Sequence, residues 1–356
     1  MQLQLIHSEL LTANSAYKKV YLQTYQAADC GDLPYQTGDW LAVQASNPAS
    51  LVADILQQLG LQGGEVIELR KVGEVSVRQA LLHHLEITQL NPAILNKMQR
   101  QLQLGNWDGR QAMIEYAYGR DILDLLTAFA PMAQLGADFL SWLSPLAPRY
   151  YSIASADTQQ VKILFKALQY HYAGRAKAGV ASNYLADLSV GEWIDVEFKA
   201  NPLFKLPPEP QTPIIMVAAG TGLAPFLGFI EQRNRQNAED NLLFFGETQR
   251  AHACLCCAQL EAAQAAGHLR LFMTFSRDQA QKRYVQDALR EQRGLLWQKW
   301  QAGAILYVCG SQQNLVPALE QLWQQWFMDE LGLSVEQAAE HWQAQRKARR
   351  IQMDVY

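Results

Sequence analysis

The sequence has 356 residues, with 30 Lys and Arg, 34 Asp and Glu, a formal net charge of -4 and 49% hydrophobic residues. This length allows two domains with an insertion. A slightly acidic chain lacks the clustered positive charge that nucleic acid or anionic lipid requires, so we expect neither as a partner. Its 5 cysteines are odd in number and follow no signal peptide, which predicts a cytoplasmic protein without a disulfide framework.

The first half of the chain is predicted to combine antiparallel sheet with helices. Residues 1–45 alternate apolar and polar positions, with a turn signal at Cys30-Gly31-Asp32. Residues 47–147 carry apolar side chains at the three- and four-residue spacing of helices. Strand patterns return at 150–154, 161–165 and 193–198. Two sheet segments therefore flank a helical insertion.

The second half begins after a proline-rich run at 206–210, which marks a domain boundary. Buried-strand patterns then alternate with amphipathic helical patterns, which indicates a parallel α/β sheet. The strand patterns are at 214–217, 242–245, 269–275 and 305–309. The apolar stretch 213–230 is interrupted by Gly220-Thr221-Gly222, so it predicts strand, loop and helix rather than a membrane span.

The glycine-threonine-glycine loop at 220–222 stands between a buried strand and a helix start. Glycines allow close approach of the backbone to a ligand, and a helix N-terminus presents free N–H groups and a positive dipole to a pyrophosphate. A tight strand-to-helix turn also needs glycine for steric reasons alone. By itself this motif leaves both interpretations open.

Hydroxyl and basic side chains follow the strand pattern at 269–275. Ser276 and Arg277 close that strand, and Lys282 follows shortly after. Such groups at the carboxyl end of a strand suit an additional phosphate, which favours NADPH over NADH. The alternative is a solvated basic patch that pairs with neighbouring acidic side chains.

A second set of candidate cofactor groups begins at Arg149, where a strand is predicted to start. Arg149 suits a phosphate, the two tyrosines after it suit a flat cofactor, and Ser152 suits a ring nitrogen. The segment 179–185 offers small residues before a helix, as a second pyrophosphate loop would. By composition alone, either segment could be an ordinary strand or turn.

The order of these motifs resembles the FAD- and NADPH-binding half of the diflavin reductases, and most strongly the sulfite reductase flavoprotein component. The motifs are R-x-Y-S, G-x-A-S-x-x-L, GTGLAPF, SRD, K-x-Y-V-Q, YVCG and a terminal DVY. The likeness covers essentially the whole chain. Seven motifs in one order are far more specific than any one of them.

The resemblance implies a protein of α/β plus all-β class with three parts. An antiparallel FAD-binding β-barrel would take 1–46 and 147–208, and an all-helical connecting insertion would take 47–146. A Rossmann-like parallel α/β domain that binds NADP(H) would take 209–356.

The resemblance also implies the cofactor contacts, with Arg149 and 179–182 on the FAD pyrophosphate and Tyr356 over the flavin face. The residues expected at FAD are Thr88, Arg149, Tyr150, Tyr151, Ser152, Tyr170, Gly179, Val180, Ala181, Ser182 and Tyr356. The residues expected at NADPH are Gly220, Thr221, Gly222, Ser276, Arg277, Lys282, Tyr284, Gln286 and Asn314.

The expected catalytic group is Ser152, Cys309, Asp354 and Tyr356. The first three would position the nicotinamide and stabilise the positive charge that develops on its ring. NADPH would have to displace Tyr356 before hydride transfer. The alternative for Cys309 is a buried thiol at a strand end, without a catalytic role.

These implications predict an NADPH-dependent FAD reductase that passes electrons to a flavodoxin, an FMN protein or a metalloprotein. The acceptor is expected to be separate because the family's flavodoxin domain has no counterpart in the sequence. The alternatives are a diaphorase that reduces quinones or oxygen, and a non-catalytic NADPH-binding module. Ala218 and Ser311, which depart from the family pattern, motivate the second alternative.

The three cysteines at 254, 256 and 257 invite comparison with a metal site. Structural zinc sites draw their ligands from two separated turns, and no second ligand pair lies near this segment. We therefore expect surface or packed thiols here and no metal.

Overall fold

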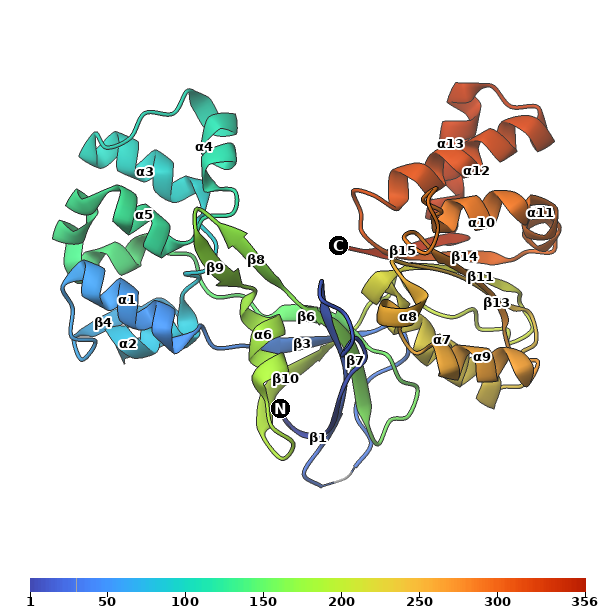
Figure 1. Cartoon of the computed structure of the whole chain (residues 1–356), viewed down its shortest axis with the longest axis horizontal. Coiled ribbons are helices and arrows are strands. Elements are labelled where there is room, and N and C mark those ends of the chain that lie inside the picture. The colour runs from blue at the N-terminus through green and yellow to red at the C-terminus, as the bar shows by residue number, and fades with distance from the viewer. Residues whose placement is uncertain (30) are drawn as a thin grey trace. The chain divides into compact units, whose positions relative to one another are not determined.

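The structure, a computed structural model, describes residues 1–29 and 31–356 (Figure 1). The turn predicted at Cys30 lies outside the described residues. The chain divides into two compact units. Unit 1 consists of Met1–Ala42, Tyr150–Lys166 and Ser189–Tyr356, and unit 2 consists of Val43–Arg149 and Ala167–Leu188.

A six-stranded sheet confirms the antiparallel sheet predicted for the first half of the chain. Its strands are β1 (Gln2–Leu10), β2 (Lys19–Gln26), β3 (Trp40–Gln44), β6 (Arg149–Ser152), β7 (Val161–Ala167) and β10 (Trp193–Lys199). Their order is β6-β3-β10-β1-β2-β7, and β1 pairs antiparallel with both β10 and β2. In β1, Leu3 and Leu5 are fully buried while the side chains between and beyond them are more exposed, as expected for a sheet with one buried face.

A five-stranded parallel sheet confirms the Rossmann-like prediction. Its strands are β11 (Ile214–Ala219), β12 (Asn241–Glu247), β13 (Arg270–Phe275), β14 (Ile305–Gly310) and β15 (Ile351–Val355). They lie in the order β13-β12-β11-β14-β15, and all neighbours are parallel. The strand β15 was not predicted; its pairing with β14 sets Asp354 beside Cys309.

Helices cover both faces of this parallel sheet (Figure 1). Those on one face are α7 (Ala224–Arg235), α8 (Arg250–Ala253) and α9 (Cys257–Ala265). Those on the other face are α10 (Val285–Glu291), α11 (Arg293–Gln301), α12 (Val316–Leu331) and α13 (Val335–Lys347). Successive side chains of β11 enter different apolar cores, Ile215 and Val217 one and Ile214 and Met216 the other, so this strand is buried on both sides.

Unit 2 is mostly helical, as predicted for the insertion, around one apolar core. Its helices are α1 (Ala49–Leu59), α2 (Val77–Gln79), η1 (Ala80–His84), α3 (Pro92–Leu102), α4 (Gly109–Ala117), α5 (Ile122–Ala128), η2 (Ala130–Trp142) and α6 (Val180–Asp187).

The insertion is not all-helical, because it also contains a hairpin of β4 (Val66–Leu69) and β5 (Gly73–Ser76). Lys71 and Gly73 have φ values of 77° and 89°, which turn the chain between the two strands. A second hairpin in unit 2, β8 (Gln169–Tyr172) with β9 (Arg175–Ala178), was also not predicted. The two residues of its turn, Ala173 and Gly174, have φ values of 50° and 79°, as tight hairpin turns require.

Candidate functional site

A cavity of about 540 Å³ lies at the carboxyl ends of β11, β12, β13 and β14, the edge of a parallel sheet where ligands bind. Several residues predicted to contact NADPH line it, namely Gly220, Ser276, Tyr284, Gln286 and Asn314. Glu247, Arg283 and Ser311 line it as well and were not among the predicted contacts. The structure thus brings together residues that are far apart in sequence, as a nucleotide site requires.

The loop at 220–222 forms a short 3-10 turn, η3 (Gly220–Leu223), that leads directly into α7. Gly220 has a φ of 57°, which favours glycine. A Cβ at Gly222 would lie 2.1 Å from the carbonyl oxygen of Cys309. Only glycine therefore allows this turn to pack against the end of β14.

Two of the predicted phosphate-binding residues, Arg277 and Lys282, do not line the cavity. The Arg277 guanidinium lies 5.7 Å from the centre of the Tyr17 ring, and Lys282 is exposed. Neither has an ion pair with another residue in the described part of the chain. The alternative of a basic patch paired with acidic neighbours holds for Arg283, which pairs with Glu291, but not for Arg277 and Lys282.

Asp354 accepts two hydrogen bonds at the end of β15. The Ser152 hydroxyl donates to Oδ2 at 2.5 Å, and the Trp40 indole Nε1 donates to Oδ1 at 3.0 Å. Only 9% of Asp354 is exposed. Burial raises the pKa of its carboxyl, and the hydrogen bonds from Ser152 and Trp40 oppose that rise.

Cys309 pairs in register with Asp354, so three of the predicted catalytic residues lie together. Cys309 is 1% exposed, and burial together with the charge of Asp354 raises the pKa of its thiol well above the usual range. The sulfur is therefore a neutral thiol at physiological pH, and it suits packing against a ligand better than nucleophilic attack.

Tyr356, the fourth predicted catalytic residue, is 65% exposed. Its hydroxyl makes a 2.7 Å hydrogen bond with the Thr221 hydroxyl of the glycine-rich loop. Its backbone N–H donates to the Gly310 carbonyl at 3.1 Å, which fixes the chain end beside β14. The terminal ring is thus held at the nucleotide loop by one side-chain bond.

The tyrosines of β6 differ in their surroundings. Tyr150 is 54% exposed, and its ring meets the Trp40 ring edge-on at 5.9 Å. Tyr151 meets Phe165 edge-on at 5.7 Å. An exposed aromatic ring on a rigid strand can lie against a flat ligand.

In unit 2, Glu86 joins two residues that were predicted to contact FAD. The Thr88 hydroxyl donates to Glu86 Oε1 at 2.7 Å, and Arg149 Nη2 pairs with Oε2 at 2.8 Å. One carboxylate therefore orients both Thr88 and Arg149.

The predicted second phosphate loop leads into α6 of unit 2. Gly179 is the residue before the helix, and no side chain caps the N–H groups of the first turn, which contains Val180, Ala181 and Ser182. The Leu168 N–H donates to the Ser182 hydroxyl at 3.1 Å, so Ser182 faces back toward β8. Burial raises the pKa of Tyr170 on β8, with smaller contributions from Asp121 and Asp124.

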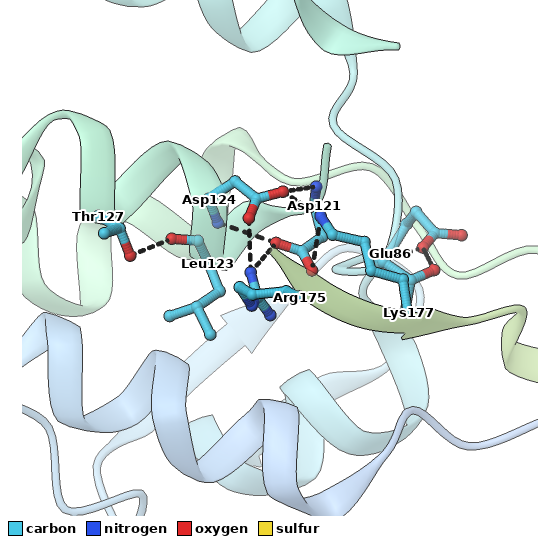
Figure 2. A network of polar contacts seen from close by, with 8 residues as sticks. Glu86, Asp121, Leu123, Asp124, Thr127, Arg175 and Lys177 are labelled. Carbon is cyan, nitrogen blue, oxygen red and sulfur yellow. Dashed lines mark hydrogen bonds and ion pairs between the residues drawn. The ribbon is translucent and has the colours of Figure 1, made fainter. Parts of the chain in front are cut away.

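Beside Thr88, unit 2 has a cavity of about 350 Å³ whose lining includes Asp121, Arg175 and Lys177. Figure 2 shows Arg175 and Lys177 of β9 meeting Asp121 and Asp124 at the start of α5. Arg175 Nη1 lies 3.0 Å from Asp121 Oδ1 and 2.6 Å from Asp124 Oδ1. These ion pairs connect the α5 N-terminus to the β8–β9 hairpin.

The cysteine segment differs from the prediction of isolated thiols. The structure joins Cys254 and Cys257 in a disulfide, with a Cα–Cα separation of 5.7 Å. The reason is local: α8 ends at Ala253, α9 begins at Cys257, and Cys256 between them has a φ of 52°. This turn brings the two cysteines together and leaves Cys256 free.

The site residues missed by the sequence analysis include Trp40, Glu86 and Glu247. Glu247 ends β12 in the nucleotide cavity and pairs with Lys18 at 2.5 Å. Its position at the end of a buried-strand pattern could have indicated it. Trp40 bonds to Asp354, 314 residues away, and Glu86 pairs with Arg149, 63 residues away, so neither contact has a local signal in the sequence.

Within residues 1–29 and 31–356, no helix is long and apolar enough to cross a membrane. The same residues include no group of three or more His, Cys, Asp or Glu side chains that could hold a metal ion.

Comparison with known proteins assigns both halves of the chain. Residues 1–184 match the FAD binding domain, and residues 216–321 match the oxidoreductase NAD-binding domain. The chain thus contains domains for FAD and for NAD(P), as predicted.

The chain is also similar to curated sulfite reductase [NADPH] flavoprotein alpha-components. That of Photorhabdus laumondii is 37% identical over 92% of this chain and 56% of the relative. That of Vibrio cholerae is 36% identical over 98% of this chain and 58% of the relative. That of Yersinia pestis is 37% identical over 99% of this chain and 59% of the relative. The predicted resemblance is confirmed, and the chain spans somewhat more than half the length of these relatives.

Proposed function

Because the chain belongs to the FAD binding domain family, we propose that it is an NADPH-dependent flavoprotein reductase. It takes hydride from NADPH and passes electrons to a separate acceptor protein. The observation that carries this proposal is the group formed by Ser152, Asp354 and Cys309 next to the glycine-rich loop. A module that only binds NADPH has no need of a buried carboxylate held by two donors at that point.

The residues present fit both cofactors. Gly222 has no room for a Cβ, and the loop at 220–222 opens into a cavity of about 540 Å³. The uncapped first turn of α6 offers N–H groups to the FAD pyrophosphate, and Arg149 and Thr88, both held by Glu86, offer a cation and a hydroxyl. Bound FAD supplies the chemistry, since a flavin accepts two electrons and releases them singly.

The chain's own residues then orient the nicotinamide. Asp354 provides a negative charge at the site where the ring becomes positive, which lowers the barrier to hydride transfer. Ser152 and Cys309 lie beside Asp354, and their role in this proposal is to limit the ring to reactive orientations. Arg277 and Lys282, which lack ion pairs within the described residues, are available to the 2′-phosphate.

The acceptor is proposed to be a separate flavodoxin-like FMN protein or a metalloprotein, of the sulfite-reducing kind that the names of the relatives imply. The protein is proposed to act in the cytoplasm. The part at 1–46 and 147–208 is assigned to FAD, 47–146 to the connecting insertion, and 209–356 to NADP(H).

Anaerobic stopped-flow mixing with NADPH tests the proposal. The purified protein, reconstituted with FAD, is expected to lose its flavin absorbance within seconds and to reduce an added flavodoxin. NADPH binding without bleaching would instead identify a non-catalytic binding module. Fast turnover with quinones or oxygen but not with flavodoxin would identify a diaphorase.

A further inference from the structure

Asp354 is a carboxylate whose two oxygens each have a different donor from the antiparallel sheet. Ser152 of β6 donates to Oδ2 at 2.5 Å, and Trp40 of β3 donates to Oδ1 at 3.0 Å. Ser152 was expected at this site. Trp40 was not, and nothing in the motif order points to it.

We propose that Trp40 is a positioning residue for hydride transfer, which keeps Asp354 ionised and aimed at the nicotinamide through the indole N–H. This inference rests on the proposed reductase function and adds a residue to it. Trp40 itself touches the carboxylate rather than the reacting atoms.

The chemistry of the donor supports this role. An indole N–H only donates, whereas a serine hydroxyl can also rotate and accept. An Oδ1 that carries the proton accepts from the Trp40 N–H more weakly than a charged oxygen does, so the indole favours the ionised carboxylate. The Trp40 ring is also fixed, because it meets the Tyr150 ring edge-on at 5.9 Å.

The other groups around Asp354 make this donor necessary. Burial of Asp354 to 9% exposure favours the neutral acid. The titratable neighbours are the Cys309 thiol of β14 and the Tyr356 hydroxyl at the chain end, and neither carries positive charge. No cationic side chain among the described residues pairs with Asp354, so the two hydrogen bonds are what holds the negative charge in place.

The first test measures the hydrogen bond itself in the full-length protein. With tryptophan labelled by 15N, the indole resonance of Trp40 is identified by its loss in Trp40→Phe. We expect this resonance to move as Asp354 titrates, and to lose that dependence on pH in Asp354→Asn. If the Trp40 resonance has the same dependence on pH in the unchanged protein and in Asp354→Asn, the proposal is overturned.

The second test measures flavin reduction by NADPH between pH 5 and pH 9, per bound FAD. Trp40→Phe keeps an aromatic ring next to Tyr150 and removes the N–H together with the rest of the indole, so the change in packing is controlled separately below. We expect a loss of about tenfold at neutral pH, the effect of one charge-assisted hydrogen bond. The acid limb of the profile should move to higher pH, so that part of the rate returns in alkali.

Trp193→Phe is the matched control, since Trp193 lies in the neighbouring strand β10 and is 41% exposed. It should behave as the unchanged protein in both tests. In an Asp354→Asn background, Trp40→Phe should have no further effect on the rate. A loss of equal size in that background would mean that Trp40 acts through packing.

The two proposals can fail separately. If NADPH does not reduce the flavin of the unchanged protein, the reductase function is wrong, and the resonance test still decides whether Trp40 holds Asp354. If the flavin is reduced and Trp40→Phe matches Trp193→Phe, only the role of Trp40 is wrong.

Discussion

We expect the hydroxyl of Tyr356 to compete with the nucleotide for the glycine-rich loop. It bonds to the Thr221 hydroxyl at 2.7 Å, while most of the ring is exposed. A pyrophosphate that approaches the loop at 220–222 must break this bond before it can use the same threonine. The cost of displacing the ring is therefore set in part by one neutral hydrogen bond, worth about 1 kcal/mol.

Tyr356→Phe removes that bond and keeps the ring. We expect the KM for NADPH to fall by roughly threefold to tenfold, because about 0.5–1.5 kcal/mol no longer opposes nucleotide entry. Steady-state kinetics with a fixed acceptor would measure this. Thr221→Val removes the same bond, but it also removes a hydroxyl that NADPH could use. A lower KM in Tyr356→Phe and not in Thr221→Val would therefore separate the loss of competition from the loss of a nucleotide contact. An unchanged KM in Tyr356→Phe would rule out the competition.

At the scale of elements, the start of α5 and the hairpin of β8 and β9 form one ionic unit. Asp121 and Asp124 form a capping box at α5, and Arg175 and Lys177 neutralise both carboxylates from β9 (Figure 2). Burial alone would raise the pKa of Asp124, but bonds from Lys177, the Asp121 N–H and Arg175 hold it below its usual value. Removing the charge of Asp124 leaves Arg175 and Lys177 with Asp121 as their one remaining carboxylate among the described residues, so the cost is at the low end of that for a broken buried pair.

Asp124→Asn is expected to destabilise the protein by about 3 kcal/mol at pH 7 in urea unfolding. Because the pKa of Asp124 is lower in the folded state, its stabilisation is complete above the unfolded value and is lost as pH falls through the folded value. The difference between the two proteins should therefore shrink below about pH 4. Asp108→Asn in the same unit, whose side chain is exposed and caps nothing, is the control. A difference that is constant down to pH 2 would contradict this origin.

Some strands could be predicted from the sequence and others could not. The strands β11, β12 and β14 were predictable because they are buried on both faces and consist mostly of apolar residues, and the edge strand β13 is partly buried but also largely apolar. The strand β15 was not, since Gln352 and Asp354 are buried polar residues that break such a run. The β8–β9 hairpin was missed because each of its strands is only 4 residues long, too short for the alternation of polar and aromatic residues at 169–172 to stand out.

The same distinction holds for the site. The two loops proposed to bind phosphate could be selected because small residues before a helix start, at 179–182 and 220–222, are visible directly in the sequence. The contacts of Trp40 and Glu86 were not found, because each joins side chains from distant parts of the chain. Such contacts depend on tertiary packing, which a single sequence does not display.

At the scale of the whole molecule, the residues expected at NADPH and those expected at the FAD pyrophosphate belong to different compact units. All the residues expected at NADPH belong to unit 1, from Gly220 to Asn314. Those expected at the FAD pyrophosphate, Arg149 and 179–182, belong to unit 2. A ligand stabilises the part of a protein that binds it, so each nucleotide should leave its own pattern of protection.

Hydrogen exchange of FAD-free protein with 2′,5′-ADP, the phosphate-bearing end of NADPH, would test this division. Protection is expected in peptides over 218–226 and 274–286, with none over 121–128 in unit 2. At a hundredfold excess over Kd, the stabilisation should approach about 2.7 kcal/mol. Arg277→Gln should weaken the binding of 2′,5′-ADP strongly and that of 5′-ADP little, because only 2′,5′-ADP has the 2′-phosphate that the Arg277 guanidinium would bind. Equal weakening of 2′,5′-ADP and 5′-ADP binding would mean that Arg277 does not bind the 2′-phosphate. Protection of 121–128 by 2′,5′-ADP would contradict the assignment of the NADPH site to unit 1.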